Sequence, residues 1–258
     1  MPALFVGHGN PMHAITENRW AGAWRELGKA LPRPRAIVSI SAHWFIPETA
    51  ITSDDRPRTI HDFGGFPREL FEVEYPAPGD PDLASEICGL VTEAAECLPS
   101  EEWGLDHGTW SVLRHMYPEA DVPVVQLSID RTKTARDHYD IGACLRSLRD
   151  DDVLVFGSGN VVHNLHAATW GDDDAVHPWA VTFEEAVRRL VVGHEFQPLI
   201  EYEDFGEIGQ LSIPTPDHYL PLIYVLGVAR DTDDVTFPTT GIDLGSVSML
   251  SVLFTDSA

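Results

Sequence analysis

Short runs of consecutive apolar residues alternate along the chain with longer segments in which apolar and polar positions recur at helical spacing. The apolar runs predict strands at residues 3–7, 36–41, 122–128, 153–157 and 246–254. The amphipathic segments predict helices at residues 20–31, 80–97, 134–149, 182–192 and 218–229. Because strands buried on both faces read as continuous apolar runs, the pattern predicts an α/β fold with a mostly parallel central sheet flanked by helices.

The 258 residues contain no repeat, no low-complexity tract and no linker long enough to divide the chain. We therefore expect a single domain over residues 1–258, with ligands gathering beyond the carboxyl ends of the strands. No apolar run approaches the roughly 18 to 20 residues that span a bilayer, and the first residues lack the pattern of a secretion signal. The sequence thus predicts a cytoplasmic protein.

Acidic residues strongly outnumber basic ones, 41 to 17, which gives a formal net charge of −24. Such a field repels nucleic acid and anionic lipid surfaces, so we expect neither a nucleic acid nor a membrane as a partner. The only lysines are Lys29 and Lys133, and acids form runs at residues 150–152 and 172–174. This excess of solvated carboxylates indicates a high-salt cytoplasm, where salt screens self-repulsion.

The three cysteines, Cys88, Cys97 and Cys144, show no CxxC spacing. That spacing would be expected of a zinc or redox motif. We predict that all three are reduced residues of the core or surface, as is usual in a cytoplasmic protein.

Three histidines follow predicted strands. His8 stands between Gly7 and Gly9 after the first strand, His43 ends the second, and His163 follows residues 153–157 and their glycine turn. The carboxyl ends of parallel strands share one edge of a sheet, so these imidazoles should lie close together. His218 follows a proline-stiffened loop at the start of a helix, and His107 lies in a glycine-flanked loop between predicted helices.

The other seven of the twelve histidines lie in polar helices or loops without a comparable setting. We interpret them as structural or supporting residues: His13, His61, His115, His138, His166, His177 and His194. Clustered neutral imidazoles without matching cysteines favour one divalent ion such as Fe(II), Zn(II) or Mn(II). Residues 157–159 do not complete either a GxSxG nucleophile turn or a GxGxxG dinucleotide loop.

Seven short motifs, in order, resemble those of the DODA-type class III extradiol ring-cleavage dioxygenases, relatives of the protocatechuate 4,5-dioxygenase catalytic subunit. They are GHGNPM, ISAHW, HDFGGFPRELFEVEYPAPGDP, GLDHGTW, VVQLSID, GSGNVVHNL and PTPDHYLPL. The similarity runs over nearly the whole chain. It implies an α/β fold holding one non-haem Fe(II), with zinc in some purified members.

The resemblance also implies roles for individual residues. His8 and His43 match the first two metal ligands, and His218 matches the position that completes the site, where the protocatechuate branch has a glutamate. His163 matches a histidine that serves as acid/base or as an additional ligand, and His107 matches a histidine near the substrate. The neighbouring acids Asp106 and Asp217 could support these groups.

The implied reaction takes a small aromatic diol and O₂, and inserts oxygen into the catechol-type ring next to the diol to give a muconic semialdehyde. Two alternatives stay open: a zinc-dependent hydrolase, which needs a carboxylate base beside the metal, and a non-catalytic metal-binding member of the same superfamily. The loop HDFGGFPREL could line the substrate pocket, with ring contacts from Phe63 and Phe66 and a carboxylate partner in Arg68. It could equally be an ordinary surface loop.

The acidic composition makes a prediction about salt. If self-repulsion among the carboxylates limits stability, the melting temperature should rise between low and molar salt, because the added ions screen that repulsion. A thermal scan over this range tests the point, and an unchanged or falling melting temperature would remove the support for a high-salt cytoplasm.

Overall fold

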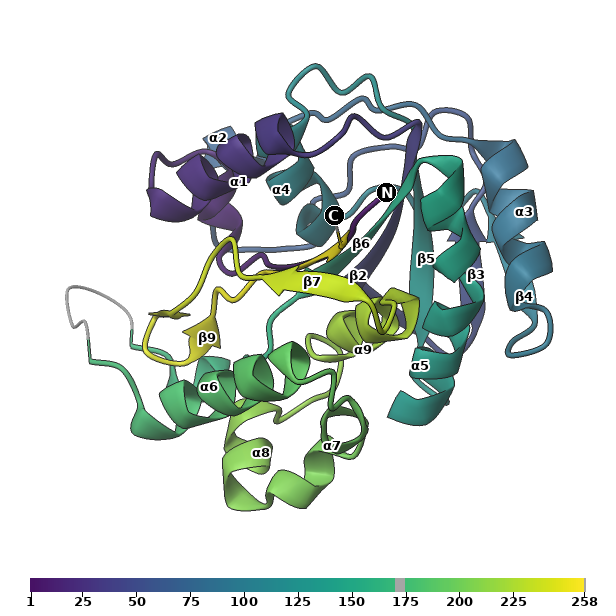
Figure 1. Cartoon of the computed structure of the whole chain (residues 1–258). Helices are drawn as coiled ribbons and strands as arrows, with labels where there is room; N and C mark the ends of the chain where they lie inside the picture. The colour runs from purple at the N-terminus through teal and green to yellow at the C-terminus, as the bar shows by residue number, and fades with distance from the viewer. Residues whose placement is uncertain (170–174, 258) are drawn as a thin grey trace.

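The computed structural model describes residues 1–169 and 175–257 (Figure 1). The acidic run at residues 172–174 therefore lies outside the described residues. The main sheet is built from β1 (Ala3–Gly7), β2 (Ala36–Ile46), β3 (Thr49–Thr52), β4 (Cys97–Ser100), β5 (Val124–Asp130), β6 (Val153–Gly159), β7 (Asp233–Thr236) and β10 (Val252–Asp256). A separate two-stranded ladder pairs β8 (Ile242–Asp243) with β9 (Val247–Ser248).

Helices connect and cover these strands. The α-helices are α1 (Arg19–Ala30), α2 (Arg68–Phe71), α3 (Pro81–Val91), α4 (His107–Met116), α5 (Ala135–Cys144), α6 (Pro178–Val192), α7 (Gln197–Ile200), α8 (Glu207–Ser212) and α9 (Leu220–Val228). The short 3₁₀ turns are η1 (Pro11–Ala14), η2 (Arg146–Asp151), η3 (Leu165–Ala167) and η4 (Tyr202–Phe205).

The sheet is mostly parallel, as predicted. Its strand order is β4-β3-β5-β2-β6-β1-β10-β7, and the four central strands β5, β2, β6 and β1 run parallel. The pairings of β1 with β10, of β10 with β7 and of β3 with β5 are antiparallel. The carboxyl ends of the central strands therefore meet at one edge, where a ligand site is expected.

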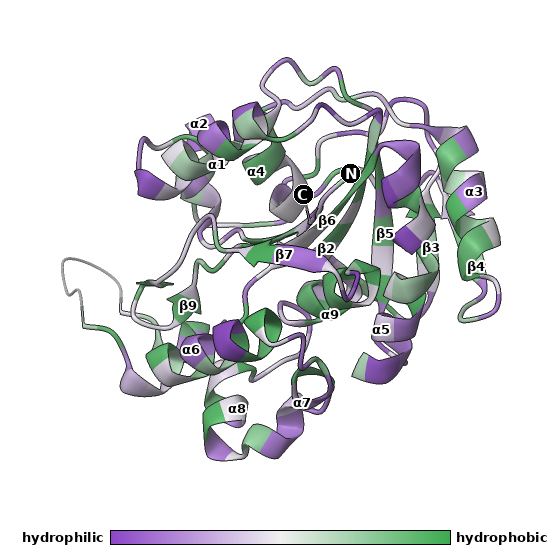
Figure 2. Cartoon of the chain, viewed as in Figure 1, coloured by the Kyte–Doolittle hydropathy of each residue, from purple (hydrophilic) through white to green (hydrophobic). Residues whose placement is uncertain are grey.

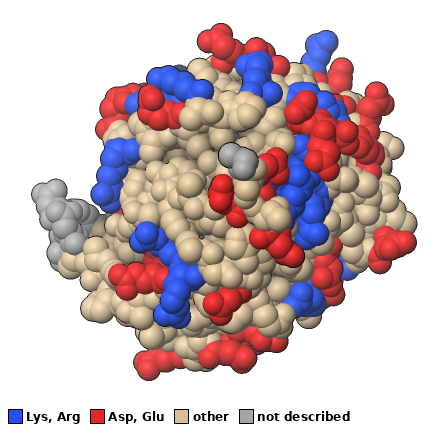
Figure 3. Space-filling model, viewed as in Figure 1, with Lys and Arg blue, Asp and Glu red and all other residues tan. Residues whose placement is uncertain are grey.

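Apolar side chains of the central strands pack on both faces of the sheet. In β1, Ala3 and Phe5 join the core beneath α3, α5, α6 and α9, while Leu4 and Val6 join the core beneath α1 and α4. This alternation explains the continuous apolar strand sequences. Every residue of α9 is buried, and Figure 2 shows this helix as mainly hydrophobic. Figure 3 shows acidic side chains spread over the surface of one face of the molecule.

A buried ion pair fixes the start of β1. Arg149, which is fully buried, donates to both carboxylate oxygens of Asp233 at 2.6 and 2.8 Å. Its Nε also donates to the carbonyl of Met1 at 2.8 Å, and the terminal ammonium donates to the carbonyl of Arg149 at 2.6 Å. These contacts hold β1 at the end opposite His8.

Several predicted element boundaries were wrong. The helix predicted over residues 80–97 ends at Val91, and Cys97 already begins β4. The loop predicted around His107 is the beginning of α4, because the buried Asp106 caps that helix by accepting from the backbone N–H of Thr109. The four-residue strands β3, β4 and β7 were not predicted, since such short segments carry little periodic signal.

The prediction of three reduced cysteines is also wrong for two of them. Cys88 of α3 and Cys97 of β4 form a disulfide, and Cys144 is free. The chain reverses between α3 and β4 and brings the two Cα atoms to 5.1 Å, a separation that a disulfide can bridge. Among the described residues, the helices are too short or too polar to cross a bilayer.

Candidate metal centre

The parallel strands deliver three histidines to one edge of the sheet. His8 directly follows β1, and His163 follows β6, the neighbour of β1 in the sheet. His43 lies within β2 on the other side of β6, where the pairing of β2 with β5 shifts register between Ile40 and Phe45. Such an irregularity changes the direction in which a strand presents its side chains. The sheet thus places the three side chains as the sequence predicted.

Glycines let the histidine-bearing segments approach one another. A Cβ atom at Gly7 would lie 2.7 Å from the carbonyl oxygen of Ser248, and Gly9 has a φ of +60°. A Cβ atom at Gly159 would lie 2.1 Å from the carbonyl oxygen of His218. The N–H of His8 donates to the carbonyl of Gly159 at 3.1 Å, so the backbone itself joins these segments. The glycines that flank His8 are therefore required by close packing and by a left-handed turn.

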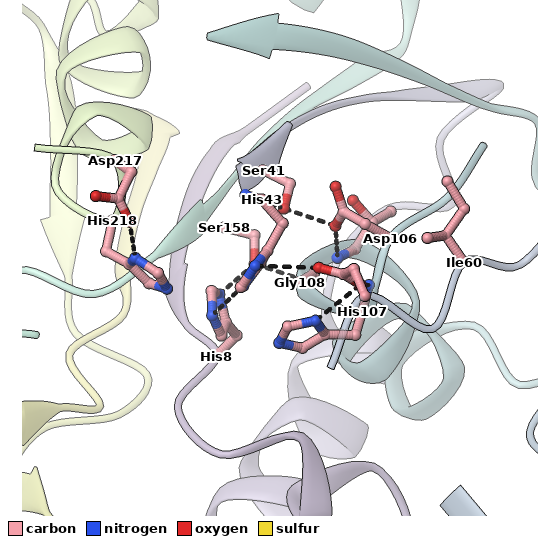
Figure 4. A network of polar contacts seen from close by, with 12 residues as sticks. His8, Ser41, His43, Ile60, Asp106, His107, Gly108, Ser158, Asp217 and His218 are labelled. Carbon is pink, nitrogen blue, oxygen red and sulfur yellow. Dashed lines mark hydrogen bonds and ion pairs between the residues drawn. The ribbon is translucent and has the colours of Figure 1, made fainter. Parts of the chain in front are cut away.

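All five predicted histidines come together around one cavity. The ring centroids of His43 and His107 are 3.8 Å apart, and the ring of His8 lies 5.1 Å from His43 and 5.7 Å from His107. His218 approaches from the other side, 5.3 Å from His8, and the ring of His163 stacks on it at 3.5 Å. Figure 4 shows His218 across the site from His107.

Among the described residues, the group of nitrogens close enough to share one ion differs from the predicted ligand set. One nitrogen each of His8, His43 and His107 lies within 4.8 Å of the others. His107 was expected beside the substrate, and His218 and His163 were expected among the ligands. The division of these five residues between metal ligands and groups that contact substrate stays a prediction.

Each of four imidazoles has its Nδ1 atom held by an acceptor (Figure 4). The hydroxyl of Ser158 donates to the carbonyl of Gly108 at 2.6 Å, so its oxygen accepts from Nδ1 of His8 at 3.0 Å. Asp217 accepts from Nδ1 of His218. These acceptors place the proton on Nδ1 and leave the lone pair of Nε2 available to a metal ion.

Asp62 accepts hydrogen bonds from the Nδ1 atoms of two rings, His43 and His107. Its Oδ2 lies 3.1 Å from Nδ1 of His43, and its Oδ1 lies 2.9 Å from Nδ1 of His107. The backbone N–H of His107 donates to the same Oδ1 at 3.0 Å. One carboxylate thus fixes the orientation of both rings.

The Nε2 atoms of His8 and His43 face each other, which shows that this cluster of histidines suits a cation. Their Nε2 atoms are 3.2 Å apart, and both Nδ1 atoms are already committed as donors. Two lone pairs that face each other at this distance repel unless a proton or a metal ion lies between them. Neutral imidazoles backed by carboxylates are also the donor set that Fe(II) and Zn(II) prefer.

Burial keeps most of these rings neutral. Desolvation and the neighbouring rings lower the pKa of His8 well below its usual range, that of His107 to about 4 and that of His163 to about 2. For His43, burial acts to lower the pKa, but the hydrogen bond to Asp62 and nearby carboxylates outweigh it and raise the pKa. For Asp62, burial acts to raise the pKa, but the hydrogen bonds from His107 and His43 lower it.

Two supporting residues, Asp62 and Ser158, were missed in the sequence. Asp62 lies in the HDFGGF loop, and Ser158 lies between glycines in β6, but neither spacing shows which imidazole each would meet. Of the two acids that were named, Asp217 contacts His218, whereas Asp106 accepts from the hydroxyl of Ser41 at 2.7 Å.

A cavity of about 250 Å³ adjoins the imidazoles. Phe63 and Phe66 line it, and the ring of Phe63 meets that of His107 edge to face at 5.4 Å. Arg68 does not line this cavity: its side chain is 88% exposed and pairs with Glu72 at 2.6 Å. The start of α2 carries this side chain into solvent, so the expected contact with a substrate carboxylate has no basis in the structure.

Most of the histidines interpreted as structural have partners outside the cluster. Nε2 of His13 lies 3.0 Å from Asp243, Nε2 of His61 lies 2.9 Å from the carbonyl of Val73, and Nδ1 of His138 lies 2.9 Å from the hydroxyl of Tyr224. His115, His177 and His194 each contact a backbone carbonyl, and His166 is exposed.

The fold and this site define an α/β protein with a histidine-rich site that could hold a metal ion at the carboxyl ends of its parallel strands. The model of the catalytic LigB subunit of aromatic ring-opening dioxygenase matches residues 2–241. The 4,5-DOPA dioxygenase extradiol of Escherichia coli K12 is 49% identical over 255 residues, covering 98% of this chain and 94% of that protein. The chain therefore belongs to the LigB family, in its DODA-type class III extradiol dioxygenase branch.

Other relatives are also similar to this chain over nearly its whole length. The 4,5-DOPA dioxygenase extradiol of Beta vulgaris is 34% identical and covers 98% of this chain and 96% of its own. A crystal structure of an uncharacterized protein from Escherichia coli K12 superposes with a TM-score of 0.86 at 44% identity, covering 99% of this chain and all of the other. Members of this family use a single metal ion.

The shared carboxylate predicts the effect of an Asp62→Asn substitution. An amide oxygen can accept from one ring, but the amide nitrogen is a donor and cannot accept from the other, so one imidazole loses its orientation. We expect the affinity for a divalent ion to fall about 10- to 100-fold, measured by calorimetric titration of metal-free protein. The exposed Asp55→Asn substitution is the matched control. Equal affinities in the two variants would contradict this role.

Proposed function

We propose that the chain is a metal-dependent extradiol dioxygenase that inserts O₂ into a catechol-type ring next to the diol and yields a muconic semialdehyde. Fe(II) is the proposed metal for activity, and Zn(II) is the proposed occupant in purified protein. The observation that carries this proposal is the set of imidazoles whose Nε2 atoms are left free beside an aromatic-lined cavity. We assign His8, His43 and His218 as ligands.

The cavity supports the choice of substrate. At about 250 Å³ it suits one aromatic ring, and Phe63 and Phe66 offer ring contacts, with Phe63 beside His107. Bound Fe(II) would lower the pKa of the catechol hydroxyls and allow electrons to pass from the ring to O₂. The protein groups would hold the ring, exclude water and accept or donate protons.

His163 is the proposed proton acceptor for the diol. Its side chain stacks on His218 and makes no hydrogen bond to another described side chain, so a ring nitrogen is free to accept. Burial and the neighbouring His218 lower the pKa of His163 to about 2 in the free protein. The negative charge of a bound catecholate would raise that pKa. His107, held by Asp62, is placed to donate a hydrogen bond to developing negative charge.

The contacts of the carboxylates disfavour the hydrolase alternative. A zinc hydrolase needs a carboxylate that is free to deprotonate water. Among the residues in 1–169 and 175–257, the two acids that touch the imidazoles, Asp62 and Asp217, are already bound to ring Nδ1 atoms.

Oxygen uptake tests the proposed reaction. After anaerobic loading with Fe(II), addition of 4-methylcatechol in air should consume oxygen in step with the formation of a yellow ring-opened product. A chelator should abolish both signals, because the diol is bound through the metal. Product formation without oxygen uptake would support hydrolysis instead. An iron-loaded protein that leaves the catechol unchanged would support a non-catalytic role.

His163→Ala separates the two roles suggested for this residue. If His163 accepts a proton, the variant should retain iron but lose about 10²- to 10⁴-fold in turnover, measured with metal content determined on the same sample. The exposed His166→Ala variant, which removes a neighbouring imidazole that does not line the cavity, serves as the control. Loss of iron from the His163→Ala protein would show that His163 is a ligand.

A further inference from the structure

A side-chain amide lies on the wall of the cavity, two residues after His8. Asn10 lines the cavity together with the five imidazoles and Asp62. The other described residues of the lining carry no polar side-chain atom: Gly9, Pro11, Phe63, Phe66, Leu165, Leu244 and Val247. Among the described side chains of this lining, the amide of Asn10 is therefore the one hydrogen-bond donor besides the imidazoles.

The turn η1 determines which end of this amide is free. Oδ1 of Asn10 accepts from the backbone N–H of Met12 at 2.9 Å and caps the turn. Because only the oxygen of the amide can meet a backbone N–H, the NH₂ group is the other end. The carbonyl of Asn10 accepts from the N–H of His13 at 2.9 Å, and His13 pairs with Asp243 of β8 at 3.0 Å, so the turn is held in place.

The NH₂ group of Asn10 makes no hydrogen bond to any residue that the structure describes. Its place on the cavity wall makes both N–H donors available to a bound molecule. The imidazoles and the divalent ion that they would hold take the diol end of a catechol, so this amide is left for an acceptor oxygen elsewhere on the ligand. The ion would also offset the charges of Asp62 and Asp217, which weakens the local repulsion of an anionic substituent.

We propose, resting on the function proposed above, that Asn10 is a specificity-determining residue whose Nδ2 atom donates a hydrogen bond to a carboxylate on the ring substituent of the catechol. A carboxylate is the acceptor that an amide donor binds most strongly. The metal would hold the diol, Phe63 and Phe66 would contact the ring, and Asn10 would recognise the substituent.

Asn10→Asp tests this assignment, because the new carboxylate can still cap the turn but replaces the two donors with a negative charge. Zn(II)-loaded wild-type and variant proteins are titrated by calorimetry with 3-(3,4-dihydroxyphenyl)propanoate, dopamine and 4-methylcatechol, which share the diol. Relative to 4-methylcatechol in the same protein, the affinity for the acid should fall at least about tenfold, and the affinity for dopamine should rise. General damage to the site would not change the two affinities in opposite directions.

Asn18→Asp is the matched control. Asn18 also caps a helix, accepting from the backbone N–H groups of Trp20 and Ala21 at 2.9 Å, and it does not line the cavity. The substitution adds the same charge, so the relative affinities should stay as in the wild type. Asn10→Ser provides a second variant: its hydroxyl can cap the turn but lacks the amide donors, so the acid should bind less tightly with no gain for dopamine.

Unchanged relative affinities in Asn10→Asp, or the same changes in Asn18→Asp, would overturn the inference. Failure of the wild-type protein to bind any of the three catechols would also overturn it. The titrations involve no turnover, so they are separate from the oxygen uptake that tests the proposed reaction. Oxygen uptake with unchanged relative affinities would leave the proposed function standing without this role for Asn10. Binding that depends on Asn10 without oxygen uptake by the iron-loaded protein would overturn the reaction and leave only the binding assignment.

Discussion

In four of the five imidazoles that line the cavity, a hydrogen bond at Nδ1 decides what the other ring nitrogen can do. Ser158, Asp62 and Asp217 hold the Nδ1 protons of His8, His43, His107 and His218, so the Nε2 lone pairs remain unshared inside a buried space. Because an unshared lone pair is costly to bury, such a cluster is most stable when a proton or a cation lies among the rings. The arrangement of these rings therefore suits a metal ion.

This arrangement depends on the sheet. β1, β6 and β2 are adjacent and parallel, so their carboxyl ends bring His8, His163 and His43 to one edge, although they are far apart in sequence. Gly159 lets the segment that carries His218 pack against the end of β6. A Cβ atom at Gly108 would lie 2.5 Å from the hydroxyl of Ser41, so glycine is also needed where α4 meets β2. Close backbone contact, rather than the side chains alone, sets the size of the site.

The sequence predicted those features that depend on local patterns. Continuous apolar runs identified the central strands, and glycines after strands pointed to His8 and His163. It could not predict features that depend on distant contacts. Asp62 lies in a loop whose path is set by tertiary packing, and Cys88 meets Cys97 only because α3 turns back into β4. His107 was assigned to a loop because the capping role of Asp106 is visible only once the helix is known. Arg68 could have met a substrate from its loop, but the start of α2 turns it outward.

The tautomers of the imidazoles show whether the Nε2 atoms are free to bind a metal ion. Long-range ¹H–¹⁵N spectra of metal-free protein with labelled histidines, recorded at a pH where the rings are neutral, distinguish a proton on Nδ1 from one on Nε2. We expect the proton on Nδ1 in His8, His43, His107 and His218, and we expect the Nε2 signals to shift when a divalent ion is added. Protons on Nε2 in these rings, with no shift on addition of metal, would contradict these expectations.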